Sequence, residues 1–146
     1  MKTKILTVLS LAIVFAIAFN SCKDDEDNNN NNGTFEEVEP NNSFATANAL
    51  TIGENYDAEI NPAQDVDYFK ITASGDKTIT VTGGSGLEVR VEAFDNSEVE
   101  LWGEDAGSRG GTLTKTVTGS SYSGYFYIKV ESAYVDDTGS YTIKCE

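Results

Sequence analysis

The feature that most constrains the fold of this chain is a repeated alternation of apolar and polar residues, which begins near Tyr56. In one example, Leu87, Val89 and Val91 alternate with charged residues. A period of two places successive side chains on opposite faces of a β-strand, so that one face is buried and the other meets water. The pattern therefore predicts strands that each cover a core with one face.

Eight segments are rich in β-branched and aromatic residues, which favour strands, and several of them show this alternation. Clusters of Gly, Asp, Asn and Ser separate them and supply the backbone conformations of tight turns. We therefore expect an all-β fold, an antiparallel β-sandwich of about eight strands. Only residues 43–50 have the apolar pattern of a short helix. The predicted strands are residues 56–60, 66–72, 77–82, 87–94, 99–102, 113–117, 125–130 and 141–145.

The N-terminal segment has a different composition. Lys2 and Lys4 precede an apolar run over residues 5–19, and polar or small residues then lead to Cys22. A charged start, a short apolar stretch and small residues at its end are the marks of a secretory signal peptide. The run falls short of the ~20 residues of a membrane span. We predict a signal peptide over residues 1–21, with a membrane anchor as the alternative.

A cysteine directly after such a segment resembles the signal of bacterial lipoproteins, in which the cysteine is lipidated and becomes the mature N-terminus. The resemblance implies that Cys22 carries a lipid anchor in the outer membrane; an ordinary signal peptide with an incidental cysteine is the alternative. The acidic residues 23–27 look like the tag that exports some lipoproteins to the cell surface. Acidic and Asn-rich composition is also typical of a disordered tether, which we place at residues 22–35.

Composition excludes several functions. The net charge is −14, which argues against nucleic-acid binding and suits the attraction of divalent cations. The chain has no histidine, so it has no Ser-His-Asp triad and no His-ligated zinc site. We expect no enzymatic activity. If Cys22 is lipidated, Cys145 has no partner, and its place at the end of an alternating strand predicts a buried thiol.

Three stretches resemble, in this order, the pre-peptidase C-terminal (PPC) domain of bacterial secreted proteins. They are the opening Glu-Val-Glu-Pro-Asn-Asn-Ser from Glu37, the strand Asp-Val-Asp-Tyr-Phe from Asp65, and a final pair of strands, Gly-Tyr-Phe-Tyr from Gly124 and Gly-Ser-Tyr from Gly139. The resemblance covers residues 36–146, which we assign to one domain. It implies a jelly-roll-like β-sandwich of the kind appended to secreted hydrolases. The collagenase relatives of that family bind collagen and calcium.

The acidic opening of this domain has a chemistry of its own. Calcium takes six to eight oxygen ligands, from carboxylates, amide carbonyls and main-chain carbonyls, in a flexible geometry. Two alternate carboxylates followed by two amides offer such oxygens, and the resemblance places a pair of aspartates opposite them. Calcium is therefore the predicted cofactor. The predicted ligands are Glu37, Glu39, Asn41, Asn42, Asp65 and Asp67.

The same residues also admit a purely structural interpretation. Asn41, Asn42 and Ser43 have the side chains that cap the first turn of a helix. Asp65 and Asp67 are then a solvated strand edge. The two interpretations differ in whether these side chains are buried together.

The expected function is that of a non-catalytic, surface-exposed lipoprotein. It would bind a protein or polysaccharide ligand, or assist a secreted hydrolase. The alternative is a structural or envelope-assembly lipoprotein without a soluble ligand.

Overall fold

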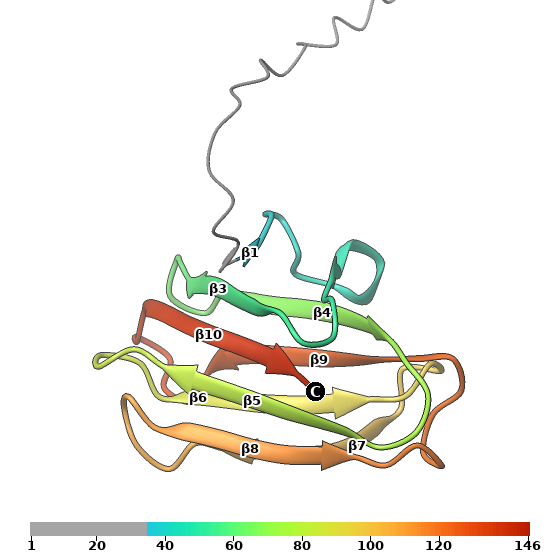
Figure 1. Ribbon diagram of the computed structural model, residues 1–146. Helices are drawn as coiled ribbons and strands as arrows, with labels where there is room; N and C mark the ends of the chain where they lie inside the picture. Colours follow the sequence, from blue (N-terminus) through green and yellow to red (C-terminus); the bar gives the residue numbers. More distant parts are fainter. Residues whose placement is uncertain (1–34) are drawn as a thin grey trace, which may run out of the picture.

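The computed structural model describes residues 35–146, so the predicted signal peptide, the lipidated Cys22 and nearly all of the predicted tether lie outside the described residues. The described part consists of β-strands and one short 3-10 helix, η1, in two sheets packed face to face (Figure 1). The elements are β1 (Phe35–Glu36), η1 (Phe44–Thr46), β2 (Asn48–Ala49), β3 (Asn55–Ile60), β4 (Val66–Thr72), β5 (Lys77–Gly83), β6 (Val89–Phe94), β7 (Glu100–Asp105), β8 (Thr112–Val117), β9 (Tyr125–Ser132) and β10 (Gly139–Cys145).

Each sheet has five strands. Sheet A has the order β1-β3-β10-β5-β8, and sheet B has the order β2-β4-β9-β6-β7. The predicted all-β sandwich is confirmed, but the number of strands and the purely antiparallel arrangement are corrected. β1 pairs with β3 and β2 with β4 in parallel, while the other strand pairs are antiparallel. Each of the two additional strands has only two residues, too few to show an alternating pattern.

The alternating residues fill the space between the sheets, as predicted. In β6, Val89, Val91 and Ala93 are fully buried, whereas Arg90 and Glu92 face the solvent side. The same alternation holds in β3, β4, β5 and β10. Burying one Val-sized side chain stabilises a fold by ~1.5–3 kcal/mol, so these inward rows supply the main stabilisation of the sandwich.

Residues 43–50 form less helix than predicted. Only η1 is helical, and it is followed directly by β2. The Phe44 ring packs against Tyr68, Phe94 and Tyr127, with ring centroids 4.7, 5.2 and 5.0 Å away. A segment this short cannot meet the cost of helix nucleation by itself. Aromatic packing against sheet B and pairing with β4 decide its conformation instead.

The N-terminal segment of the described chain connects the two sheets. Phe35, which the sequence placed in the tether, already belongs to β1, and its ring stacks on Tyr56 at a centroid distance of 5.1 Å. From β1 in sheet A, residues 37–47 cross to β2 in sheet B, along the side of the sandwich where β3 and β4 lie (Figure 1). Among residues 35–146, no helix has the length and apolar character required to cross a membrane.

Candidate metal centre

The crossing segment holds its acidic residues against the side of the sandwich. The backbone amide of Glu37 donates to the carbonyl of Asp57 in β3 (3.1 Å). Four residues further on, the carbonyl of Asn41 accepts from the amide of Tyr68 in β4 (3.0 Å). The segment is therefore tied to one sheet at each end, with Glu39 between the two anchoring points.

Asp67 belongs to the inward row of β4, together with Phe69 and Ile71. Its side chain is fully buried, and its Oδ2 accepts a 2.6 Å hydrogen bond from the Tyr141 hydroxyl. Burial raises the pKa of Asp67 to about 8, against the effect of this bond, and the charges of Glu37 and other nearby carboxylates raise it further. Without a bound cation, Asp67 therefore holds a proton near neutral pH.

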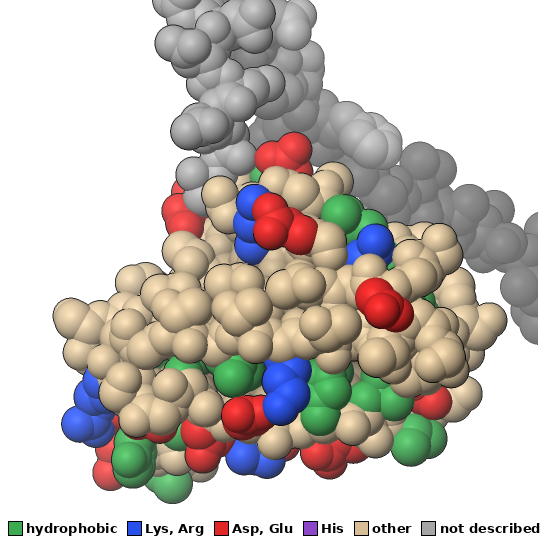
Figure 2. Space-filling model, turned by 60° about the horizontal axis from the view of Figure 1, so that its bottom comes forward, with side chains coloured by type: hydrophobic (Ala, Val, Ile, Leu, Met, Phe, Trp, Pro, Cys, Tyr) green, Lys and Arg blue, Asp and Glu red, His purple; other side chains and the backbone are tan. Residues whose placement is uncertain are grey.

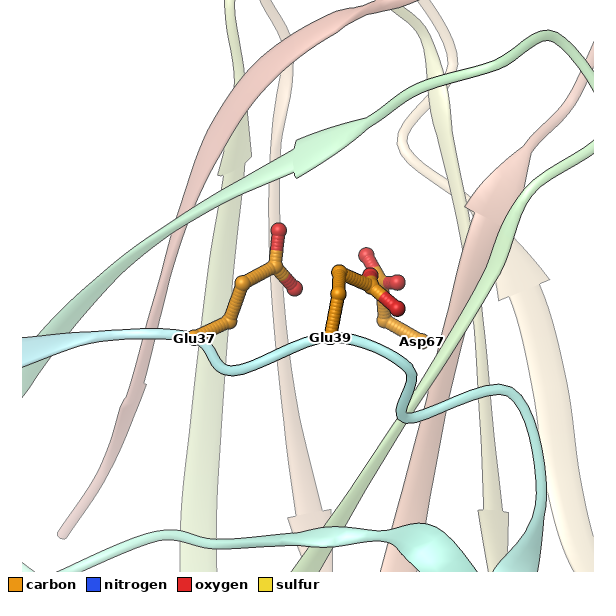
Figure 3. A group of neighbouring side chains, drawn as sticks. All are labelled: Glu37, Glu39 and Asp67. Atoms are coloured by element: carbon orange, nitrogen blue, oxygen red, sulfur yellow. The ribbon is translucent and has the colours of Figure 1, made fainter. Parts of the chain in front are cut away.

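Three carboxylates meet at this point. One oxygen each of Glu37, Glu39 and Asp67 lies within 4.8 Å of the other two. Figure 3 shows Glu37 and Glu39 projecting from the same segment, with their carboxylates on the side where the carboxylate of Asp67 lies. Burial also raises the pKa of Glu37, and the Glu39 charge adds to this rise. Carboxylates this close repel one another unless a proton or a cation lies between them.

Asn41 adds a buried amide to the cluster. Its Nδ2 donates to Glu37 Oε2 (3.1 Å), and its backbone amide donates to Glu39 Oε2 (3.0 Å). Its side-chain carbonyl oxygen is buried and has no hydrogen-bond partner among the described residues, and the same is true of Asp67 Oδ1. Leaving a buried acceptor unsatisfied costs ~1–3 kcal/mol. A cation bound by both oxygens would remove that cost.

The donor set fits calcium. The candidate ligand atoms are carboxylate oxygens of Glu37, Glu39 and Asp67 and the carbonyl oxygen of Asn41. All are hard oxygen donors, which hard cations such as calcium prefer over the nitrogen and sulfur ligands of zinc. Calcium also tolerates the mixed and irregular geometry of such a group better than magnesium does. These four side chains would therefore hold the ion.

The other two predicted ligands form a separate pair. Asn42 Nδ2 donates to Asp65 Oδ1 (2.7 Å), and this oxygen also accepts from the amide of Val66 (2.9 Å). Asp65 Oδ2 accepts from the amide of Asn61 (3.1 Å). Asp65 therefore fixes the turn between β3 and β4. Asp65 affects the three-carboxylate cluster only through its negative charge, which raises the pKa of Asp67.

The structural interpretation of these residues is not supported. Ser43 is the residue before η1, but its side chain makes no capping bond and instead bonds to the Thr46 hydroxyl (2.8 Å). Asp65 and Asp67 are 5% and 0% exposed, so they are not a solvated strand edge. The burial of both aspartates excludes a solvated strand edge, although only Asp67 enters the three-carboxylate cluster.

Sequence reasoning missed the role of Tyr141. This residue lies in β10, 74 residues after the aspartate that it contacts, and no local pattern connects the two. Burial raises the pKa of the Tyr141 hydroxyl well above its usual value, so it remains a donor at any physiological pH. In the sequence, its place in the Gly-Ser-Tyr stretch from Gly139 was the signal that marked it.

Comparison with known proteins supports the fold. No protein-family model and no curated protein matches the chain. Among solved structures, it is similar to the pre-peptidase C-terminal domain of collagenase from Bacillus anthracis, known from a 1.0 Å crystal structure. The TM-score is 0.54 at 14% sequence identity, over 68% of this chain and 94% of that chain. The described residues therefore share the β-sandwich fold of that domain, as the motifs predicted.

Proposed function

We propose that this chain is a non-catalytic binding module whose sandwich is stabilised by calcium. The observation that carries the proposal is the cluster of Glu37, Glu39 and Asp67, in which one oxygen of each residue lies within 4.8 Å of the other two. Asp67 Oδ1 and the neighbouring Asn41 Oδ1 are buried and have no hydrogen-bond partner among residues 35–146. The ion would be bound by these carboxylates and by Asn41. The fold supports a module role, because one similar solved structure is the pre-peptidase C-terminal domain of a collagenase.

Calcium would act here mainly on stability. It would neutralise the mutual repulsion of the three carboxylates and tie the segment between β1 and β2 to β4. A ligand that binds only the folded state adds about 2.7 kcal/mol of stability at a free concentration one hundred times its Kd. In a domain of about 100 residues, this amounts to a rise in Tm of roughly 10 °C or more.

The location of the module is part of the proposal and is supported by sequence alone. A lipid on Cys22 would hold the chain at the outer membrane, and the acidic residues that follow would direct it to the cell surface. The module would then present itself to an extracellular protein or polysaccharide, or to a secreted hydrolase. A structural envelope lipoprotein without a soluble ligand is the alternative, and it needs no site other than the metal centre.

Thermal unfolding with and without calcium tests the metal centre. We expect Tm to rise in excess calcium relative to excess chelator, and to rise much less in excess magnesium. In Glu39→Gln, which removes one charge from an exposed side chain, the rise should be reduced. Superimposed melting curves of the unmodified protein in calcium and in chelator would reject the proposal.

A further inference from the structure

The outer face of sheet A carries hydroxyl groups almost throughout β5, β8 and β10. Strand alternation places these side chains on the solvent side, and all are exposed or half-buried. Lys144 is the one charged residue in these outward rows. Figure 2 shows the face as a broad band with few hydrophobic or charged side chains. The hydroxyl residues are Thr78, Thr80, Thr82, Thr112, Thr114, Thr116, Ser140 and Thr142.

The outer face of sheet B differs in character. There Arg90, Glu92, Lys129 and Glu131 form a network of ion pairs with N–O distances of 2.9–3.8 Å. In the outward rows of β5, β8 and β10, by contrast, only Lys144 is charged. Such a face suits a ligand that is itself neutral and forms hydrogen bonds.

A hollow of about 380 Å³ opens on the outer face of sheet A. It extends from β5 across β10 to β3. Strand register aligns Asp57, Thr142, Thr82 and Thr112 in one straight row across four strands. The first three of these side chains line the hollow, together with Ser140. Its volume is within the range of about 300–1,000 Å³ that small-molecule sites occupy.

Gly84 makes room for the hollow, and Gly83 before it packs toward the interior of the sandwich. Gly84 follows β5, and its amide donates to the carbonyl of Ser140 (2.7 Å). A Cβ on Gly84 would lie 2.7 Å from that same carbonyl oxygen, and a Cβ on Gly83 would lie 2.4 Å from the carbonyl oxygen of Leu87. The backbone packing therefore requires glycine at both positions. Gly84 lies beside Ser140 and has no side chain, so the surface is hollowed there.

The hydrogen-bonding groups in the hollow are available to a ligand. The side chains of Asp57, Ser140 and Thr142 make no hydrogen bond or ion pair to another residue within 35–146, and the Thr82 hydroxyl bonds only to Thr112 (2.9 Å). A carboxylate accepts two hydrogen bonds side by side, and each hydroxyl both donates and accepts. Neighbouring hydroxyls on a sugar ring offer the complementary set of donors and acceptors.

We propose that this hollow binds a neutral glycan, with Asp57 accepting from two adjacent sugar hydroxyls and Thr82, Ser140 and Thr142 bonding to the others. The threonine rows of β5 and β8 would extend the contact along the chain of the glycan. This inference rests on the proposed role as a binding module and names its ligand class. It does not depend on the metal centre, because no residue that lines the hollow belongs to the proposed calcium ligands.

Calorimetric titration of the full-length protein with neutral hexasaccharides tests this site. The probes are cellohexaose, xylohexaose, mannohexaose and chitohexaose, each added to the unmodified protein and to three variants. Asp57→Ala and Thr142→Val remove groups from the hollow. Thr116→Val makes the same change outside it, on the same face. All three positions are exposed, so melting curves should show that the variants fold.

We expect at least one hexasaccharide to bind saturably, with a loss of about tenfold or more in Asp57→Ala and in Thr142→Val and no change in Thr116→Val. Absence of binding by all four probes would overturn the inference, and so would binding that both variants in the hollow leave intact. A calcium-dependent rise in Tm without glycan binding would reject only the glycan site. Glycan binding without that rise would reject only the calcium centre.

Discussion

The hydroxyl of Tyr141 in sheet A donates a 2.6 Å hydrogen bond to the carboxyl group of Asp67 in sheet B. Both side chains are buried, so the bond crosses the interior of the sandwich rather than its surface. It occupies one oxygen of Asp67, while the other has no partner among residues 35–146. The bond therefore joins the hydrophobic core to the candidate metal centre.

Replacing Tyr141 by Phe should destabilise the domain. The variant keeps the ring but removes the donor, and leaving the buried Asp67 acceptor unsatisfied costs ~1–3 kcal/mol. Urea unfolding in chelator measures the change. Tyr125→Phe is the control, because its hydroxyl makes a longer bond (3.3 Å) to the carbonyl of Asn96 at a half-buried position. Equal stability of Tyr141→Phe and the unmodified protein would show that the bond contributes nothing.

Stability without calcium should fall as the pH rises. The folded-state pKa of Asp67 is raised to about 8 from an ordinary value of 3.8, so between these values the folded chain holds a proton that the unfolded chain has released. The stability that Asp67 contributes by holding this proton is therefore complete below about pH 4, and it is lost as the pH approaches 8. We expect Tm in chelator to decrease from pH 5 to pH 8.

Asp67→Asn provides the control for this pH dependence. Asn has the same size and can accept from Tyr141, but it does not titrate. The decrease in Tm should become shallower in this variant, and excess calcium should have a similar effect on the unmodified protein. If the variant and the unmodified protein in chelator lose stability with the same slope, Asp67 is not the titrating group.

These results show which parts of the fold were accessible from sequence. Seven of the eight longer strands were predicted within two residues of their ends, and most of them have an apolar row that reveals the period. β7 was predicted to end three residues early, because its second half, residues 103–105, contains no apolar row. β1 and β2 were missed, since their pairing with β3 and β4 depends on how the chain crosses the sandwich. The helix over residues 43–50 was overestimated because Phe44 packs on the outer face of sheet B, a contact made by three distant residues.

The candidate site was accessible only in part. Oxygen-bearing side chains at alternate positions indicated the Glu37 and Glu39 segment, and the resemblance brought Asp67 to it. Local sequence does not distinguish Asp67, which enters the cluster, from Asp65, which bonds to backbone amides of its own turn. Their different roles depend on the inward row of β4 and on Tyr141 in a distant strand.

The thiol of Cys145 should be unreactive in the folded protein. The residue is fully buried, as its position in an alternating strand predicted, and burial raises its pKa to about 11. Thiolate is the reactive form, so alkylation at pH 8 should be slow until denaturant is added. In the Cys22→Ser variant, Cys145 is the sole thiol, and mass spectrometry can follow it. Alkylation of the native protein as fast as that of the unfolded chain would contradict the described packing.

Cys22→Ser also tests the proposed anchor. Without a cysteine to lipidate, the protein should move from the membrane fraction to the soluble fraction when cells are fractionated. Cys145→Ser is the matched control and should stay with the membranes. Retention of the Cys22→Ser variant in the membrane fraction would contradict lipidation at this residue.

Calorimetric titration with calcium shows directly whether the carboxylates of Glu37, Glu39 and Asp67 bind one calcium ion. We expect one site per chain in the unmodified protein. We also expect affinity at least about tenfold weaker in Glu39→Gln, because affinity follows the number of charged ligands. Glu36→Gln, which removes an exposed charge from β1, should bind as the unmodified protein does. The absence of calcium binding, or equal affinity in Glu39→Gln and Glu36→Gln, would contradict the account.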